Sequence, residues 1–108
     1  MNKKPRARLS SSSRRRLRAR AHPMKVVVIV GASGVTDAVV AAVNEALRVH
    51  GLIKVRINAA DRNARKKLAA EICGRADAEL IQTIGHVAVL FREPDDDKLR
   101  QAFSKVLD

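Results

Sequence analysis

Four small residues, Gly31-Ala32-Ser33-Gly34, are the part of this sequence best placed to do chemistry, because they separate an apolar run from an amphipathic segment. A strand, a glycine loop and a helix start form an anion-binding arrangement, since loop and helix N–H groups point outward and the helix dipole favours negative charge. Thr36 is the expected N-cap of that helix, and Asp37 occupies a first-turn position that suits an acid. The loop therefore predicts a place where phosphate approaches the backbone.

Three interpretations of this loop are open. A dinucleotide-binding turn needs a third glycine for close packing of helix on strand, but that position holds Asp37, which would also repel phosphate. Glycines that only turn the chain are common, because glycine adopts positive φ without steric cost. The third interpretation is a GxxG clamp on the backbone of single-stranded RNA, which requires two glycines and no catalytic side chain.

Positive charge is concentrated at one end of the 108-residue chain, whose formal net charge is +11. Residues 1–25 contain ten Lys or Arg and no acid, whereas residues 26–108 contain 12 basic and 11 acidic side chains. A one-sided basic block indicates attraction to a polyanion, either nucleic acid or an acidic membrane surface. Among the three interpretations of the loop, this basic block favours the GxxG clamp on RNA. An Arg-rich, Ser-rich and acid-free head is also the composition of an organelle transit peptide, which is the alternative for this segment.

Several classes of protein are disfavoured by what the sequence contains. No apolar run approaches the roughly 20 residues needed to span a bilayer, so no membrane contact is expected. The single Cys73 excludes an internal disulfide and leaves no cysteine pair for zinc. The three histidines lie far apart and lack a metal-ligand spacing, and no Ser-His-Asp constellation is visible. We therefore expect no metal, no cofactor and no enzymatic activity.

Hydrophobic periodicity and turn residues predict one compact α/β domain. The predicted helices run from Ser10–Ser13 to about Ala21, from Thr36 to about His50, from Asp61 onward and over 95–107; the predicted strands are 25–30, 52–57, 79–84 and 87–92. Gly85-His86 is expected to form a short hairpin between the last two strands. The predicted fold is a four-stranded mixed sheet with helices mainly on one face. Residues 1–8 are expected to be a disordered basic tail, 9–94 the domain, and 95–108 a C-terminal extension.

The candidate nucleic-acid contacts combine the loop with basic residues on both sides of it. They are Gly31, Ala32, Ser33 and Gly34, the helix arginines Arg14, Arg15, Arg16, Arg18 and Arg20, and the strand residues Lys25, Lys54 and Arg56. Lys54 and Arg56 share one face of their strand, opposite the apolar Ile53, Val55 and Ile57. No exposed Tyr or Trp is available to stack bases, so shape and phosphate recognition are expected to dominate.

Five stretches of this sequence resemble one known domain. They are Ala21-His22-Pro23, VVVIVGASGVTDAVV at 26–40, Glu45-Ala46-Leu47, residues 50–57, and Ile84-Gly85 followed by Val89-Leu90-Phe91-Arg92. Together they resemble the CRM domain, and more narrowly its stand-alone bacterial YhbY type, over about residues 9–94. Two departures stand out: Phe91 occupies a position where Tyr is usual, and His86 one where Lys or Arg is common.

The resemblance implies a fold similar to the C-terminal domain of translation initiation factor 3, and RNA binding by the GxxG loop and a flanking basic surface. It implies a cytoplasmic, ribosome-associated role, because stand-alone bacterial members associate with precursors of the large ribosomal subunit. We thus expect a monomeric, non-catalytic protein that binds ribosomal RNA during ribosome assembly. The alternative is a DNA-coating or architectural protein of the Alba type, whose small basic α/β fold is broadly similar.

Overall fold

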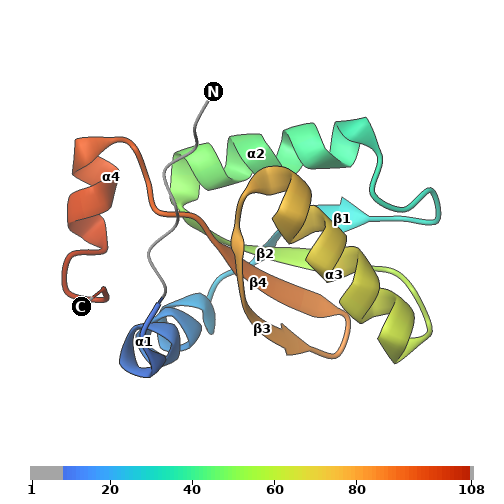
Figure 1. Ribbon diagram of the computed structural model, residues 1–108, viewed down its shortest axis with the longest axis horizontal. Coiled ribbons are helices and arrows are strands. Elements are labelled where there is room, and N and C mark those ends of the chain that lie inside the picture. Colours follow the sequence, from blue (N-terminus) through green and yellow to red (C-terminus); the bar gives the residue numbers. More distant parts are fainter. Residues whose placement is uncertain (1–8, 108) are drawn as a thin grey trace.

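The structure, a computed structural model, describes residues 9–107 (Figure 1). The elements in chain order are α1 (Ser11–Ala21), β1 (Val26–Val30), α2 (Asp37–His50), β2 (Leu52–Ile57), α3 (Arg62–Ala76), β3 (Glu79–Ile84), β4 (Val87–Phe91) and α4 (Asp97–Ala102). The predicted disordered tail, residues 1–8, lies outside the described residues. Within residues 9–107, no helix combines the length and the apolar character that crossing a membrane requires.

Each of the first three helices begins at a residue whose side chain caps it. The side chains of Ser10, Thr36 and Asp61 accept hydrogen bonds from the backbone amides three residues further on. Such caps satisfy amides that have no partner inside the helix and typically contribute about 1 kcal/mol each. These local signals explain why the predicted helix starts are confirmed.

The four strands form one mixed sheet in the order β1-β2-β4-β3. β1 and β2 are parallel, whereas β4 is antiparallel to both β2 and β3. The predicted four-stranded mixed sheet is confirmed, as is the Gly85-His86 hairpin between β3 and β4. This topology places the carboxyl ends of β1 and β2 and the β3–β4 hairpin at the same end of the sheet.

α2 and α3 cover one face of the sheet and enclose the larger core (Figure 1). Val43 and Leu47 of α2 and Ile72 of α3 pack there on Val55 and Leu90 of the sheet, all at most 1% exposed. The β-branched and leucine side chains of the central strands β2 and β4 are buried on this face, as expected for strands in the middle of a sheet.

α1 and the C-terminal segment cover part of the opposite face. Leu17 and Ala21 of α1 pack with Leu52, Phe91 and other residues in a second core. The helices were predicted to lie mainly on one face. This holds for the two longest helices, but the second face is also covered, because Leu17 and Ala21 lie one helical turn apart and form an apolar stripe.

The C-terminal extension is part of this second core. The Phe103 ring meets Phe91 edge-on, with ring centroids 5.2 Å apart, and Val106 is also buried. The extension is helical only over Asp97–Ala102, which is shorter than the predicted 95–107, and turns follow it. Asp96 caps this helix through a hydrogen bond from the Leu99 amide.

Candidate nucleic-acid interface

Three loops meet at one end of the sheet, and backbone hydrogen bonds hold them together. The Asn58 amide donates to the Val30 carbonyl (2.9 Å), which joins the end of β2 to the residue before the glycine loop. The Ile57 amide donates to the His86 carbonyl (2.7 Å), which joins β2 to the hairpin. The glycine loop, the β2–α3 connection and the hairpin therefore form one continuous edge, which we call the loop end.

The glycine loop, residues 31–34, is a tight turn whose tip is exposed. The Gly34 amide donates to the Gly31 carbonyl (3.0 Å). Gly34 has a φ of +74°, which residues other than glycine rarely adopt. Gly31 has no positive φ, and a Cβ placed on it would meet no atom within 4 Å. Gly34 thus shapes the turn, whereas Gly31 leaves open space at the approach to the backbone.

The α2 side of the loop is fixed by Arg75 of α3. Its guanidinium donates to the Val35 carbonyl (2.9 Å) and to an Asp37 carboxylate oxygen (2.6 Å). The sequence analysis held Asp37 to repel phosphate at this helix start. The ion pair with Arg75 offsets part of that negative charge and fixes its position beside the loop.

The first turns of α3 add a basic group to the loop end that the sequence analysis left out of its candidate site. It consists of Arg62, Arg65, Lys66 and Lys67, with Asp61 as the only acid in the preceding turn. Arg65 is committed to the fold, because its Nη1 donates to the carbonyls of Ala59 and Ala60 at 2.8 and 2.7 Å.

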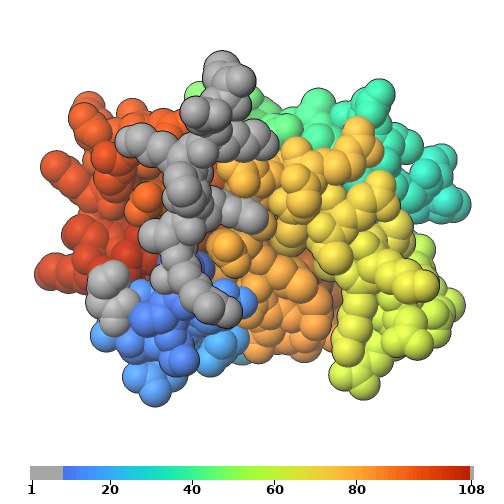
Figure 2. All heavy atoms as spheres, viewed as in Figure 1, coloured from blue at the N-terminus to red at the C-terminus, as the bar shows by residue number. Residues whose placement is uncertain are grey.

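The other three side chains of this group are exposed. Figure 2 shows the start of α3, in yellow-green, at the same edge of the molecule as the projecting glycine loop, in cyan. The signal for this group was present in the sequence as four cations within six residues of a predicted helix.

An open strip of the sheet also faces solvent at the loop end. Ile29, Arg56, Val87 and Ile84 lie opposite one another in register across all four strands, on the face that α1 covers only further along. Ile29 and Ile84 are 60% and 57% exposed, which is unusual for large apolar side chains inside strands. The Arg56 side chain is fixed in this strip by a hydrogen bond that its Nε donates to the Asn58 Oδ1 (3.0 Å).

The arginines of α1 do not lie beside the glycine loop. Figure 1 shows α1 and the loop at opposite ends of the molecule. The expected closeness of the α1 arginines to the glycine loop is therefore wrong. β1 follows α1 in the chain but runs away from it, and the loop lies at the far end of β1.

Three of the five α1 arginines bind backbone carbonyls of the protein itself. Arg14 donates to Leu80 (2.6 Å), Arg16 to Val106 (3.3 Å) and Arg20 to Ala102 (2.6 Å). Arg20 also lies over the Phe103 ring, 4.9 Å from its centroid. These contacts tie α1 to β3 and to the C-terminal extension. Arg15, in contrast, is exposed and Arg18 half-buried, and neither guanidinium is bonded to another side chain or carbonyl within residues 9–107.

Two further candidates lie between the two ends. Lys54 is half-buried, and its Nζ donates to the His22 carbonyl (2.9 Å) at the end of α1. Lys25 is exposed at the start of β1, beside the residue that pairs with Lys54. Lys54 and Arg56 share one face of β2, so they form a short basic track from α1 toward the loop end.

The guanidinium groups of Arg92 and Arg48 bind other parts of the protein itself. Arg92 donates to the Asn44 side chain (2.8 Å) and to the Ala76 carbonyl (2.7 Å), which links β4 to α2 and α3. Arg48 makes a bidentate pair with Glu45, and this pairing lowers the pKa of the Glu45 carboxyl and raises that of Arg48. Neither is at the loop end.

The whole arrangement is that of a known domain, because residues 9–92 match the family of the CRS1 / YhbY (CRM) domain. This chain belongs to the CRM domain family. Its glycine loop and the hairpin both lie within the match, whereas α4 lies beyond it. Among residues 9–107, no group of three or more His, Cys, Asp or Glu side chains is placed to hold a metal ion.

Relatives within the family carry names that refer to RNA. An RNA-binding protein of Haemophilus influenzae is 36% identical over 92 residues, which are 85% of this chain and 93% of that one. A Pseudomonas aeruginosa protein named "Probable RNA-binding protein PA4753" is 34% identical, over 79% of this chain and 82% of its own. The solution structure of a Staphylococcus aureus protein described as a candidate RNA-binding protein superposes with a TM-score of 0.75. It is 27% identical over 83% of this chain and 94% of that one.

Proposed function

We propose that this protein binds RNA through its loop end, without catalysing a reaction. The observation that carries the proposal is the convergence of the GxxG loop, the exposed cations of α3 and the strip containing Arg56 at one end of the sheet. The names of the family relatives support RNA as the ligand.

The chemistry of the loop end suits a sugar–phosphate chain. Small residues at 31–34 allow close approach of the backbone, as in the GxxG loops that clamp nucleotide backbones. Arg62, Lys66 and Lys67 add positive charge within reach of neighbouring phosphates. The apolar side chains of the strip offer a surface against which unpaired bases lie, in place of the Tyr and Trp rings that this chain lacks.

Gly31→Val tests this proposal with little disturbance of the fold, because Gly31 has open space around it and no positive φ. We expect RNA affinity to fall about tenfold while the thermal midpoint stays within a few degrees. Ala41→Val is the control, since Ala41 is exposed on α2 and lies outside the loop. Equal RNA affinity for the folded Gly31→Val variant and the native protein would refute a role for the loop.

We also propose the specific partner that the family resemblance implies: ribosomal RNA in precursors of the large ribosomal subunit, bound in the cytoplasm by a single copy of the chain. Gradient fractionation of cell extracts then places the protein with large-subunit precursors and not with translating ribosomes. Ultraviolet crosslinking followed by sequencing identifies the attached RNA. Recovery only in the ribosome-free fraction, at low salt as well as high, contradicts this partner but not RNA binding itself.

The Alba-like alternative is tested by competition. Single-stranded RNA, single-stranded DNA of the same sequence and duplex DNA are titrated against a labelled RNA–protein complex. We expect RNA to compete best, since a 2′-hydroxyl is available only there. Duplex DNA competing more strongly than RNA favours the architectural role.

A further inference from the structure

A cavity of about 280 Å³ lies at the loop end, between the first turns of α3 and the β3–β4 hairpin. Its size is near the lower end of the roughly 300–1,000 Å³ that small-molecule sites occupy. Its lining residues are Ile57, Arg62, Arg65, Lys66, Thr83, Gly85, His86, Val87 and Ala88. No residue of the GxxG loop lines it, so the cavity is a position at the loop end separate from the loop itself.

The two walls of the cavity differ in chemistry. The α3 wall carries three cations, of which Arg65 is held by the Ala59 and Ala60 carbonyls and keeps the helix start in place. Arg62 and Lys66 are exposed and have charge available for an anion. The sheet wall is formed by Ile57 and Ala88, whose side chains lie on the face that α3 covers, and by Thr83, which pairs with Ala88. A ligand that fits both walls has an anionic group attached to a flat or apolar one.

His86 adds a hydrogen-bonding position between the walls. Its Nδ1 lies 3.3 Å from the Ile57 carbonyl oxygen. A carbonyl only accepts hydrogen bonds, so this contact requires the proton on Nδ1. In the neutral ring Nε2 is then left as an acceptor. A phosphodiester of an RNA chain offers no donor to such an acceptor at neutral pH, but a base amino group or a ribose hydroxyl does. The Thr83 hydroxyl can both donate and accept at the same wall.

We propose that this cavity is a nucleotide subsite, which takes one unpaired nucleotide of the RNA bound at the loop end. Arg62 and Lys66 hold its phosphate, the sheet wall of Ile57 and Ala88 receives the base, and His86 with Thr83 recognises polar groups of the base or sugar. The subsite rests on the proposed RNA-binding function and adds to it a position that contacts a base. The hydrogen bond between Ile57 and His86 connects this subsite to the β2 end that supports the GxxG loop.

Amide chemical shifts of the full-length chain provide the direct test, with three probes: each of the four ribonucleoside monophosphates, inorganic phosphate, and a single-stranded RNA of about four nucleotides. We expect the monophosphates to shift the amides of residues 62–66 and 83–88. Inorganic phosphate is expected to shift only the α3 amides. Equal shifts from phosphate and from every monophosphate would reduce the cavity to an adventitious anion site and overturn the proposal.

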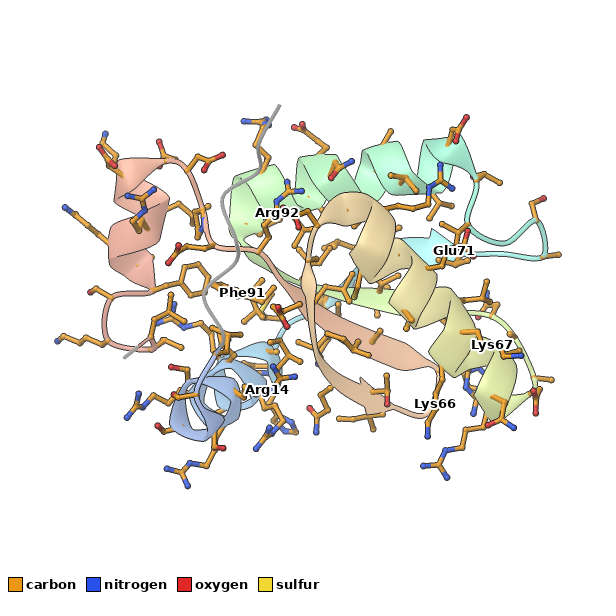
Figure 3. The ribbon with its side chains drawn as sticks, in the orientation of Figure 1. Arg14, Lys66, Lys67, Glu71, Phe91 and Arg92 are labelled. Carbon is orange, nitrogen blue, oxygen red and sulfur yellow. The ribbon has the colours of Figure 1, made fainter. Side chains whose placement is uncertain are left out.

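Lys66 and Lys67 provide a matched pair of variants, because they have the same charge and are adjacent and exposed, but only Lys66 lines the cavity. Figure 3 shows Lys66 near the hairpin end of the sheet and Lys67 on another side of α3. We expect Lys66→Gln to weaken RNA binding about tenfold, the loss of one charge-assisted contact. Lys67→Gln removes the same charge outside the cavity. Because no cavity contact is lost, we expect it to weaken RNA binding only about twofold.

Thr83→Leu keeps every charge and fills the cavity, and we expect it to abolish the monophosphate shifts at residues 84–88. Equal effects of Lys66→Gln and Lys67→Gln, or unchanged monophosphate shifts in Thr83→Leu, would overturn the subsite. If the native chain binds RNA but no monophosphate, the subsite fails and the proposed function stands. If Gly31→Val and all three variants leave RNA affinity unchanged, both fail.

Discussion

Gly51 joins α2 to β2 at a point where two constraints coincide. Its φ is +75°, and a Cβ there would lie 2.9 Å from a Phe103 ring carbon and 3.1 Å from Pro94 Cγ. An L-residue in this conformation costs about 1–2 kcal/mol, and the clash with a packed ring adds to it. We expect Gly51→Ala to lower the free energy of unfolding by at least about 2 kcal/mol in a urea titration. Gly31→Ala, which meets no neighbouring atom, is the control and should stay within about 0.5 kcal/mol.

Arg92 stabilises the fold and is not among the candidate RNA contacts. Its guanidinium satisfies the Ala76 carbonyl and both the side chain and the carbonyl of Asn44. Hydrogen bonds to charged groups contribute roughly 1.5–3 kcal/mol, so we expect Arg92→Ala to destabilise the fold by about 2 kcal/mol. RNA affinity at a temperature where the variant is folded should not change. Arg48→Ala, an exposed arginine paired with Glu45, is the control for the loss of one positive charge.

At the scale of elements, the C-terminal extension acts as a cover for the second core. Phe103 is 3% exposed and contacts the Phe91 ring, and the carbonyls of the same segment accept hydrogen bonds from Arg16 and Arg20 of α1. We expect Phe103→Ala to cost about 3 kcal/mol, within the range for buried Phe truncation. Hydrogen exchange should then accelerate in α1 and at 97–107 before it does in α2 and α3. Uniform acceleration across all helices would contradict this cover.

The starts of the first three helices and the β3–β4 hairpin were predictable because their signals are local. Ser10, Thr36 and Asp61 begin helices through contacts three residues away, and Gly85-His86 turns the chain within two residues. The positions of α1 and α4 were not predictable in the same way. They depend on Leu17 and Phe103 meeting the sheet face that Leu52 and Phe91 share. The sequence shows only that these residues are apolar, not which face of the sheet they cover.

For the candidate site too, the sequence predicts the local patterns but not how they are placed relative to one another. The GxxG loop is a local pattern, so the sequence identifies it directly. The α3 cations are visible in the sequence as a cluster within a predicted helix, but their place in the site depends on topology. Only because β4 lies between β2 and β3 does the Gly85-His86 hairpin come to the first turn of α3. The α1 arginines were misplaced for the converse reason, since closeness in the chain does not fix closeness in space.

At the scale of the whole molecule, positive charge is divided between two ends of a body with extents of 36 × 33 × 21 Å. At one end lie Arg15 and Arg18 of α1, whose guanidinium groups bind no carbonyl or side chain of residues 9–107. At the other is the loop end, with Lys66 and Lys67. Lys54 and Arg56 lie between them on β2. An RNA that contacts the loop and α1 together therefore has to cross the sheet face along this track, whereas a short one contacts the loop end alone.

Salt dependence distinguishes these two modes of binding. Each phosphate contact that is lost flattens the slope of log affinity against log salt by about 0.7 on single strands. Two double variants remove equal charge: Arg15→Gln with Arg18→Gln, and Lys66→Gln with Lys67→Gln. Both spare Leu17 and the carbonyl-bound Arg14, Arg16 and Arg20, and Gln is a good helix former, so the fold is expected to survive.

We expect the α3 variant to flatten the slope by about 0.7, through the loss of the Lys66 contact, with RNA of any length. The α1 variant should do so only with RNA long enough to reach α1, and should leave the slope unchanged for an RNA of about four nucleotides. If the basic head is instead an address tag with no role in binding, the α1 variant keeps the native slope with long RNA as well. Binding isotherms at several salt concentrations, for each variant and each RNA length, decide between the two, because only a head that contacts RNA makes the slope of the α1 variant differ from the native slope with long RNA.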